Sequence, residues 1–216
     1  MKSVLVIGLG RFGRHLAHKM AELGNDVMVV DKDAEIIAQV AAEFSDAQIG
    51  DCTNESVLRA LAISHFDLCF VTIGEDFQSS LVITFLLKQY GAQRIVAKAR
   101  QSIQADLLRQ IGACEVIYPE REMAERIAIR YSARNIFDYI PLTGEYSIYE
   151  IPVLPAWIGR SVAEVNVRKK YNVNIVAIKN SNALQPVPGG DYIFCAADHI
   201  VVIARSADVS KLSAKT

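Results

Sequence analysis

The sequence predicts an α/β protein, in which a Rossmann-like, doubly wound parallel sheet is followed by a small C-terminal α+β subdomain. Three observations lead to this fold class. Short apolar segments alternate with helix-like segments through residues 1–140. The glycines Gly8, Gly10 and Gly13 lie between the first apolar segment and the first helix-like segment. After residue 140 the strand-like segments are short and separated by turns.

The first predicted domain, residues 1–140, should hold six strands and the helix that leads out of it. The strands are expected at residues 4–7, 27–30, 47–49, 68–72, 94–97 and 115–118, and the helices at 12–23, 32–44, 54–61, 76–90, 102–111 and from 119 onward. Asn54 caps one helix, and Pro119 occupies the first position of the last one. Six apolar strands separated by helices require a parallel sheet that is covered on both faces.

The second predicted domain, residues 141–216, reads as a compact α+β module. A strand is expected at 146–153, a helix at 161–171, a strand at 174–179, a turn at 186–190 and a pair of strands within 192–204. The tail from Ser206 is polar and is expected to be frayed. His199 stands alone beside an apolar run, which favours a structural or solvated role, and no catalytic constellation is evident in this domain.

Composition excludes several classes of protein. Of the 216 residues 51% are hydrophobic and 22% are charged, with a net charge of −1, so binding to nucleic acid is not expected. The four cysteines are scattered, which favours reduced core residues rather than a disulfide framework or an exported protein. No apolar run approaches the ~20 residues of a membrane span, and the N-terminus leads straight into a strand. Work at a membrane would therefore need a partner.

The glycine turn predicts a phosphate site, since its backbone can approach a phosphate placed at the positive end of the following helix. Asp31 ends the second strand, where a carboxylate can take both ribose hydroxyls of NAD, ADP or ATP and disfavours NADP. Helix capping is the alternative for Asp31. Asp51 and Cys52 follow the third strand and can line the adenine, although Asp51 also suits a simple turn residue.

Cationic residues and the next strand ends complete the predicted site. Arg11 opposes the dipole of its helix, which points to a further anion such as the third phosphate of ATP, with a solvated side chain as the alternative. Lys98 either reaches a phosphate or is a solvated strand-end charge. The residues expected beside the phosphates are Thr72, Ile73 and Gly74.

The helix from Pro119 raises two further questions. Glu120 either coordinates a cation or is an ordinary acid at a helix start. The apolar stripe on this helix packs on its own sheet or on a second subunit; it consists of Met123, Ala124, Ile127, Ala128 and Tyr131. Farther along, Arg168 belongs to a basic cluster that suits a helix end or a small anionic ligand.

Several segments together resemble the regulatory subunits of Ktr/Trk-type bacterial potassium uptake systems. These segments are residues 6–13, 71–74, 111–123 and 166–171. The likeness spans almost the whole chain, as a regulator-of-potassium-conductance (RCK) domain, or TrkA-N domain, with its C-terminal TrkA-C subdomain, and it is nearest to the KtrA type.

The resemblance implies a ligand-gated regulator rather than an enzyme. It implies that ATP, ADP or NAD(H) binds in the first domain of a cytoplasmic homodimer. The dimers would assemble into an octameric ring beneath a membrane potassium-translocating subunit of the KtrB/TrkH kind. By position, Arg11 would meet the terminal phosphate of ATP, and Glu120 would hold Mg²⁺, Ca²⁺ or Na⁺ at the dimer interface. Some members bind cyclic di-AMP at the positions of Arg168, Asn174, Ile175 and Pro188.

The predicted nucleotide-binding residues are Gly8, Gly10, Arg11, Phe12, Gly13, Asp31, Lys32, Asp51, Cys52, Thr72, Ile73, Gly74, Lys98 and Glu120. An NAD-dependent oxidoreductase is the alternative function. It would need an acid/base group over the nicotinamide, which the second domain does not evidently offer. A redox-sensing transcription regulator would need a DNA-reading helix pair and a basic face, and the sequence indicates neither.

Overall fold

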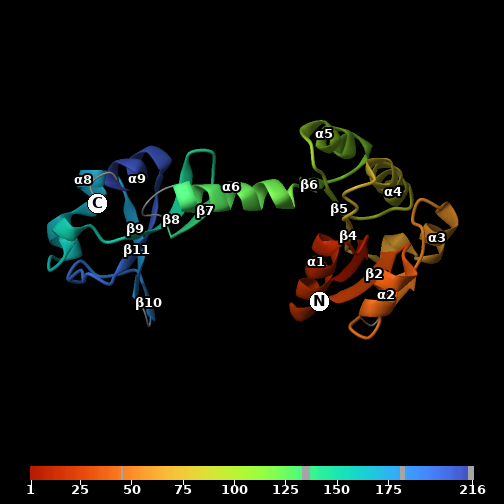
Figure 1. Cartoon of the computed structure of the whole chain (residues 1–216), viewed down its shortest axis with the longest axis horizontal. Coiled ribbons are helices and arrows are strands. Elements are labelled where there is room, and N and C mark those ends of the chain that lie inside the picture. Colours follow the sequence, from red (N-terminus) through yellow and green to blue (C-terminus); the bar gives the residue numbers. More distant parts are fainter. Residues whose placement is uncertain (45, 133–136, 181–182, 214–216) are drawn as a thin grey trace. The chain divides into compact units, whose positions relative to one another are not determined.

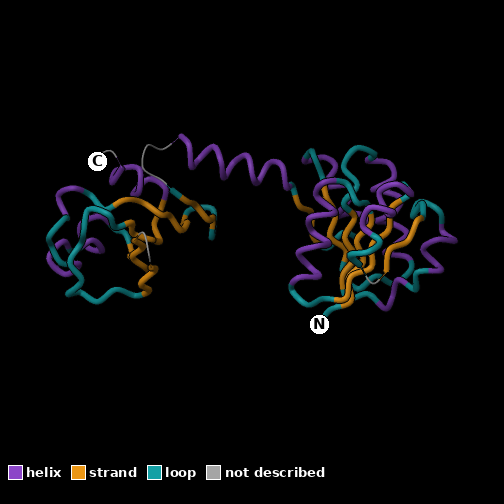
Figure 2. The backbone as a smooth tube through the Cα atoms, turned by 60° about the horizontal axis from the view of Figure 1, so that its bottom comes forward, coloured by secondary structure: helices purple, strands orange, loops and turns teal. Residues whose placement is uncertain are grey.

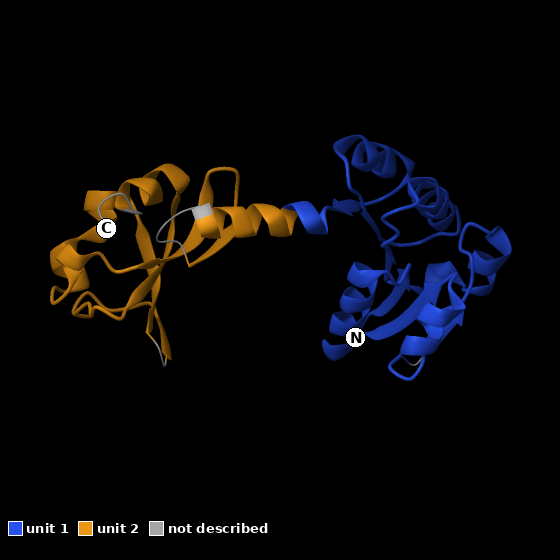
Figure 3. Cartoon of the chain, viewed as in Figure 1, with its two compact units in different colours: residues 1–121 blue, residues 122–216 orange. Residues whose placement is uncertain are grey.

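The structure is a computed structural model that describes residues 1–44, 46–132, 137–180 and 183–213. The chain divides into two units, residues 1–121 and 122–216 (Figure 3). The predicted boundary at residue 140 falls instead within a strand, β7 (Asp138–Pro141), which pairs with the next strand of the second unit. The division therefore comes earlier, inside the long helix α6 (Pro119–Ser132).

Unit 1 alternates strands and helices as the sequence predicts (Figure 1). Its strands are β1 (Ser3–Ile7), β2 (Asp26–Asp31), β3 (Asp46–Ile49), β4 (Leu68–Val71), β5 (Ile95–Lys98) and β6 (Glu115–Ile117). Its helices are α1 (Arg11–Glu22), α2 (Ala34–Val40), α3 (Glu55–Ala60), the 3₁₀ turn η1 (Ile63–His65), α4 (Phe77–Gln89), α5 (Ser102–Ile111) and the first residues of α6. Asn54 caps α3 through its side chain, as expected, and Asp76, predicted only as the first residue of its helix, caps α4 in the same way.

The sheet of unit 1 has the order β3-β2-β1-β4-β5-β6, and every neighbouring pair is parallel. The order reverses between β1 and β4, because the chain returns to the middle of the sheet after β3. In such sheets ligands bind at the carboxyl ends of the strands beside this reversal. The predicted doubly wound sheet is confirmed, and it places the glycine turn after β1 at that point.

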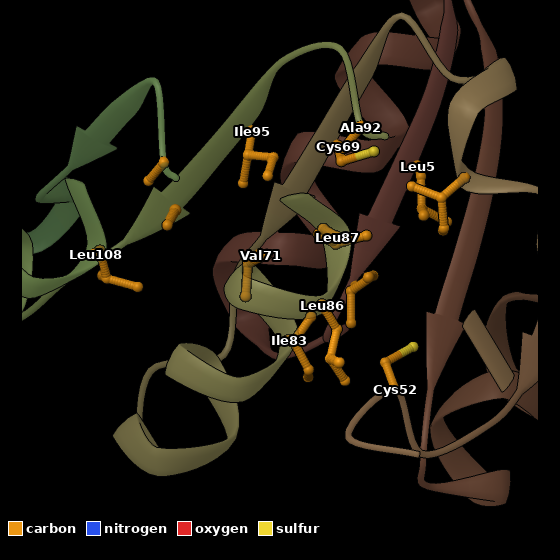
Figure 4. Close-up of a cluster of buried hydrophobic side chains, with 14 of the residues drawn as sticks. Leu5, Cys52, Cys69, Val71, Ile83, Leu86, Leu87, Ala92, Ile95 and Leu108 are labelled. Atoms are coloured by element: carbon orange, nitrogen blue, oxygen red, sulfur yellow. The ribbon is translucent and has the colours of Figure 1, made fainter. Parts of the chain in front are cut away.

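Both faces of this sheet are buried, which explains why its strands read as continuous apolar runs. One core cluster joins alternate strand residues to α3, α4 and α5; among its members are Leu5, Cys69, Val71, Ile83, Leu87, Ile95 and Leu108 (Figure 4). The other cluster packs the opposite strand residues, such as Val4 and Val6, against Ala17 of α1 and Ile37 of α2. The strand alternation of period two therefore sends neighbouring residues into different layers.

Unit 2 contains the rest of α6, a small antiparallel sheet and short helices (Figure 2). Its strands are β7 (Asp138–Pro141), β8 (Tyr146–Pro152), β9 (Asn174–Asn180), β10 (Ala183–Pro186) and β11 (His199–Arg205), in the order β10-β9-β11-β8-β7. Its other helices are the 3₁₀ turn η2 (Pro155–Trp157), α7 (Val162–Val165), α8 (Val167–Tyr171) and α9 (Ser206–Ser213). One core cluster, which includes Trp157 and Phe194, covers one face of the sheet.

Several predicted details of unit 2 are wrong. The single helix over 161–171 is two short helices, because Asn166 adopts a left-handed conformation (φ 51°) between them. In place of a strand pair within 192–204 there is one strand, β11; the Asp198 carboxylate accepts hydrogen bonds from Tyr192 and from the Cys195 N–H, which closes a turn.

The prediction that the tail from Ser206 is frayed is also wrong. The tail forms α9, and its residues Val209 and Leu212 are each only 1% exposed, within the core cluster of unit 2. Their spacing of three residues places both on one face of a helix, which the polar composition of the tail concealed. The strand β10 was not predicted at all; it pairs with β9 through Pro186 opposite Ala177.

The cysteines divide equally between core and surface. Cys52 and Cys69 are buried, as expected, whereas Cys114 and Cys195 are exposed, and all four are free. Among the described residues, no helix combines the length and the apolar character needed to cross a membrane.

Candidate functional site

A pocket of about 430 Å³ opens where β1 and β4 end in unit 1. Its volume falls within the range of small-molecule sites, roughly 300–1,000 Å³. The structure brings all but one of the fourteen predicted nucleotide-binding residues to its wall: Gly8, Gly10, Arg11, Phe12, Asp31, Lys32, Asp51, Cys52, Thr72, Ile73, Gly74, Lys98 and Glu120. The exception, Gly13, lies behind the turn and not in the lining.

Gly8 and Gly13 are required for different reasons. Gly8 has a φ of 94°, a conformation that side chains oppose, and its N–H donates to the Val30 carbonyl at 2.9 Å. A Cβ at Gly13 would lie 2.0 Å from the Gly8 carbonyl oxygen and 2.5 Å from Thr72 Oγ1. Gly13 therefore lets α1 approach β1 and β4 closely, and its role is in packing the turn.

The Thr72 hydroxyl is already used by this turn. Thr72 is 6% exposed, and its Oγ1 donates to the backbone carbonyls of Gly8 and Ile7, the latter at 3.0 Å. Sequence reasoning placed Thr72 beside the phosphates. The structure places it at the pocket wall, with its donor committed to holding the shape of the turn.

Asp31 is held rigidly at the end of β2. Its carboxylate accepts the Leu9 N–H at 2.5 Å and the Asp33 N–H at 2.9 Å, so it joins the glycine turn to the β2 end. The cap of α2 is Asp33, whose side chain accepts from Glu35 and Ile36. Capping, the alternative considered for Asp31, is therefore carried out by Asp33, and the Asp31 carboxylate faces the pocket.

Arg11 begins α1 at the rim of the pocket. No described side chain caps α1, and its first turn contains no acid, so the first N–H groups and the helix dipole are open to an anion. The Arg11 side chain is exposed and takes part in no hydrogen bond or ion pair with the described residues. A cation kept next to an uncapped helix start is suited to a multiply charged anion.

Lys98 and Glu120 form an ion pair on another side of the pocket. Lys98 ends β5 and is 8% exposed, and its Nζ donates to Glu120 Oε1 at 2.5 Å. This hydrogen bond lowers the pKa of Glu120 below its ordinary value. The Lys98 Nζ also lies 5.7 Å from the centre of the Phe12 ring, on the first turn of α1. The alternative of a solvated Lys98 is wrong, because the side chain is buried.

Asp51 and Cys52 differ in character although they are adjacent. Asp51 accepts from the N–H and the hydroxyl of Thr53, a turn contact that lowers the pKa of the carboxyl group. Asp51 therefore acts as a turn residue, which was the alternative considered for it, and it also lines the pocket. Burial raises the pKa of Cys52 to about 12, so this thiol is neutral and supplies an apolar wall.

Three charged residues of the lining, Arg100, Glu75 and Asp76, were not predicted as part of the site. Arg100 lies 3.9 Å from Glu75 in a loose and exposed pair. The sequence could have indicated Arg100, because it follows Lys98 by two residues and side chains at that spacing in an extended chain lie on the same side.

A metal ion at Glu120 is not supported by the residues of one chain. Within residues 1–44, 46–132, 137–180 and 183–213, no three His, Cys, Asp or Glu side chains group together in a way that suits a metal ion. The Glu120 carboxylate is instead bound to the Lys98 ammonium.

In unit 2, three of the four residues compared with cyclic di-AMP positions come together. The Val187 N–H donates to the Val176 carbonyl at 2.9 Å, which brings Pro188 back toward Asn174 and Ile175 at the start of β9. Arg168 lies on α8, just before that strand, and is exposed. These residues line neither of the two pockets described here.

A second concavity, of about 700 Å³, lies within unit 2 between α6 and the sheet. His199 Nδ1 lies 2.8 Å from Glu150 Oε1 there, its ring stacks on Phe137, and Lys179 also binds Glu150. His199 therefore does not stand alone, as the sequence indicated. No local pattern marks this cluster, because its members come from four different strands or their approaches.

Comparison with known families decides the relationship of the chain. Residues 4–119 match the model of the TrkA-N domain and residues 147–216 that of the TrkA-C domain. The chain belongs to this TrkA family. The TrkA-N match covers the sheet of unit 1 and ends at the first residue of α6, whereas the TrkA-C match begins within β8.

Two curated relatives match this chain over nearly their whole length. It is 37% identical to the Ktr system potassium uptake protein C of Bacillus subtilis (strain 168) over 210 residues, 97% of this chain and 95% of the relative. It is 33% identical to the Ktr system potassium uptake protein A of the same organism, with the same coverage. The resemblance predicted from the sequence is confirmed.

Solved structures share the fold of this chain. The GsuK channel matches 99% of this chain with a TM-score of 0.72 and 17% identity, and the chain covers 39% of the channel. The GsuK RCK domain matches 99% with a TM-score of 0.68, and the chain covers 47% of it. A GsuK channel bound to NAD matches with a TM-score of 0.66 and 18% identity.

Proposed function

We propose that the protein is a cytoplasmic regulatory subunit of a potassium uptake system, that it binds ATP or ADP in the pocket of unit 1, and that it catalyses no reaction. The observation that carries the proposal is the pocket itself, in which an uncapped helix start, a rigid Asp31 and the cations Arg11 and Lys98 surround one space. The names of the Ktr relatives supply the physiological setting. Structures of GsuK with NAD and with ADP support an adenine nucleotide and keep NAD(H) as a candidate ligand.

The proposed mechanism is a shift between conformations. ATP and ADP share the adenosine and differ in their terminal phosphate, so only a group that meets this phosphate can tell them apart. Arg11 is assigned to it because its side chain is unpaired among the described residues and begins α1. Regulation requires that each ligand favours a different state, since equal affinity for both states shifts nothing.

The partners follow from the same family. The protein is expected to act as a homodimer assembled into an octameric ring on a KtrB/TrkH-like membrane subunit at the inner face of the membrane. A Mg²⁺, Ca²⁺ or Na⁺ ion at Glu120 would need further oxygen ligands from the nucleotide or from a second subunit. Cyclic di-AMP at Arg168, Asn174, Ile175 and Pro188 is a separate proposal, which rests on their positions in the sequence and on the approach of Pro188 to β9.

Calorimetric titration of ATP, ADP, NAD and NADH tests the nucleotide proposal. Arg11→Ala should weaken ATP binding about tenfold, the equivalent of roughly 1.4 kcal/mol, and should change the affinity for ADP by less than about twofold. Arg14→Ala is the matched control, since Arg14 lies on the same helix, binds Gln39 and does not line the pocket. Equal weakening of both nucleotides would remove the role assigned to Arg11.

The same samples separate the alternatives. Oxidation of a 2-hydroxy acid with NAD would favour an oxidoreductase instead. Cyclic di-AMP should raise the melting temperature of the parent but not of an Arg168→Ala variant, and the absence of a shift in the parent would exclude that ligand.

A further inference from the structure

The geometry points to an exchange in which Lys98 leaves the Glu120 carboxylate and binds the terminal phosphate of a nucleotide, thereby freeing the start of α6. This inference rests on the proposed function and names how the same pocket is regulated. It differs from the role assigned to Arg11, because Lys98 already has a partner within the chain.

The position of Lys98 makes it available to an anion in the pocket. Its Nζ lies 5.7 Å from the centre of the Phe12 ring, on the first turn of α1, whose N–H groups attract a phosphate. Gly74 faces the same ammonium, since a Cβ at Gly74 would lie 3.3 Å from Nζ. The absence of a side chain at Gly74 therefore leaves room for the ammonium to turn from Glu120 toward the glycine turn.

Competition follows from charge. The Lys98 side chain is 8% exposed, so its ammonium depends on anionic partners, whereas the Glu120 side chain is 63% exposed and is readily hydrated when released. A phosphate carries more charge than a carboxylate and takes a charge-assisted hydrogen bond from the same donor. Arg100 also lines the pocket and acts electrostatically on Glu120, so the released carboxylate keeps a cation nearby.

The exchange matters beyond the pocket because of where Glu120 stands in the chain. It is the second residue of α6, which continues from unit 1 into unit 2. The pair joins the end of β5 to the start of this helix, so breaking it removes a link between the sheet and α6. A ligand that takes Lys98 should loosen the first turn of α6, and one that does not reach Lys98 should leave it intact.

Titration of ATP and ADP into matched variants, without divalent ions, tests the exchange. Glu120→Gln removes the competitor for Lys98 and should tighten ATP about fivefold, with a smaller effect on ADP. Glu115→Gln is the control, because it removes the same charge from an exposed ion pair of unit 1, with Arg94, that lies outside the pocket lining, and it should change either affinity by less than about twofold. Repeating Glu120→Gln in a Lys98→Met background completes a double-mutant cycle. In that background most of the gain in ATP affinity should disappear.

Hydrogen exchange gives a second readout that affinity does not determine. ATP should speed exchange of the amides that donate to the first-turn carbonyls of α6, relative to ADP in the parent, and Glu120→Gln should show fast exchange of these amides with either ligand. If Glu120→Gln weakens ATP binding, or raises ATP affinity equally with and without Lys98, the proposed exchange is wrong, while the proposal of nucleotide binding stands. If the parent binds neither nucleotide, the proposed function fails and the exchange fails with it.

Discussion

The two units place their polar side chains differently. In unit 1 the charged residues collect at the carboxyl ends of parallel strands, where Asp31, Lys98 and the glycine turn meet around one pocket. In unit 2 the polar residues Glu150, Lys179 and His199 lie across the antiparallel sheet, where Lys179 and His199 both contact the Glu150 carboxylate. The first arrangement leaves an uncapped helix start and Arg11 unpaired among the described residues, whereas the second pairs these three side chains within the unit.

The difference follows from strand direction. Parallel strands all end at the same edge, so the turns that follow them converge, and both sheet faces remain available for the core. Antiparallel strands end at alternate edges, so polar residues gather on a face and pair across strands. A ligand site is therefore expected in unit 1. Trp157, the single tryptophan of the chain, lies in the core of unit 2, so its fluorescence reports on the unfolding of that unit alone.

The largest effect is expected from Gly13→Ala. The new Cβ would meet the Gly8 carbonyl at 2.0 Å, so unit 1 should lose about 4 kcal/mol or more of stability in urea unfolding followed by circular dichroism. The Trp157 fluorescence transition should stay unchanged. Gly10→Ala is the control, because nothing lies within 4 Å of a Cβ added at this position, and it should change the stability of unit 1 by less than about 1 kcal/mol. A matching shift in the Trp157 transition would show that the units do not unfold separately.

A smaller effect, confined to the other unit, is expected from Leu212→Ala. Leu212 is 1% exposed in the core that contains Trp157, and its truncation should cost about 3 kcal/mol in the Trp157 unfolding transition. Lys211→Ala, on the exposed side of α9, should cost little. Equal effects of the two substitutions would mean that α9 does not pack on the sheet.

The smallest effect concerns pH and Glu150. Burial raises the pKa of Glu150, but hydrogen bonds from His199 and Lys179 outweigh it, so the pKa lies below the ordinary 4.5. A lowered folded-state pKa means that the pairs stabilise unit 2 above this ordinary value and that the contribution is lost as pH falls through the folded-state pKa. The stability difference between the parent and Glu150→Gln, of order 1 kcal/mol, should therefore shrink as the pH falls below about 4.5. A difference that is constant across this range would contradict the assignment.

Much of unit 1 was predictable because its signals are local. The apolar strands, the caps Asn54 and Asp76, and the glycine turn each lie within one segment. The list of pocket residues followed from the rule that parallel strands end at one edge. It missed the charged residues Glu75, Asp76 and Arg100 because the loops after the strands were not followed further.

Unit 2 was predicted less well because its elements are short and depend on their neighbours. The burial of α9 is decided by contacts with distant segments, whereas the helix break at Asn166 and the turn held by Asp198 are local conformations that apolar periodicity does not indicate. The strand β10 is exposed along its length, so it has no apolar alternation that would indicate a strand.

The sequence by itself determined the fold class, the place of the glycine turn and the family, since periodicity and motif spacing are properties of the chain. Only the tertiary structure decided which charges are paired. Lys98 and Glu120 lie on different elements, as do Glu150 and His199, and their contacts depend on how strands and helices pack. An ion pair depends on distance and burial, which local patterns do not contain. For that reason only the structure shows Arg11 without a partner among the described residues and Lys98 buried and paired with Glu120.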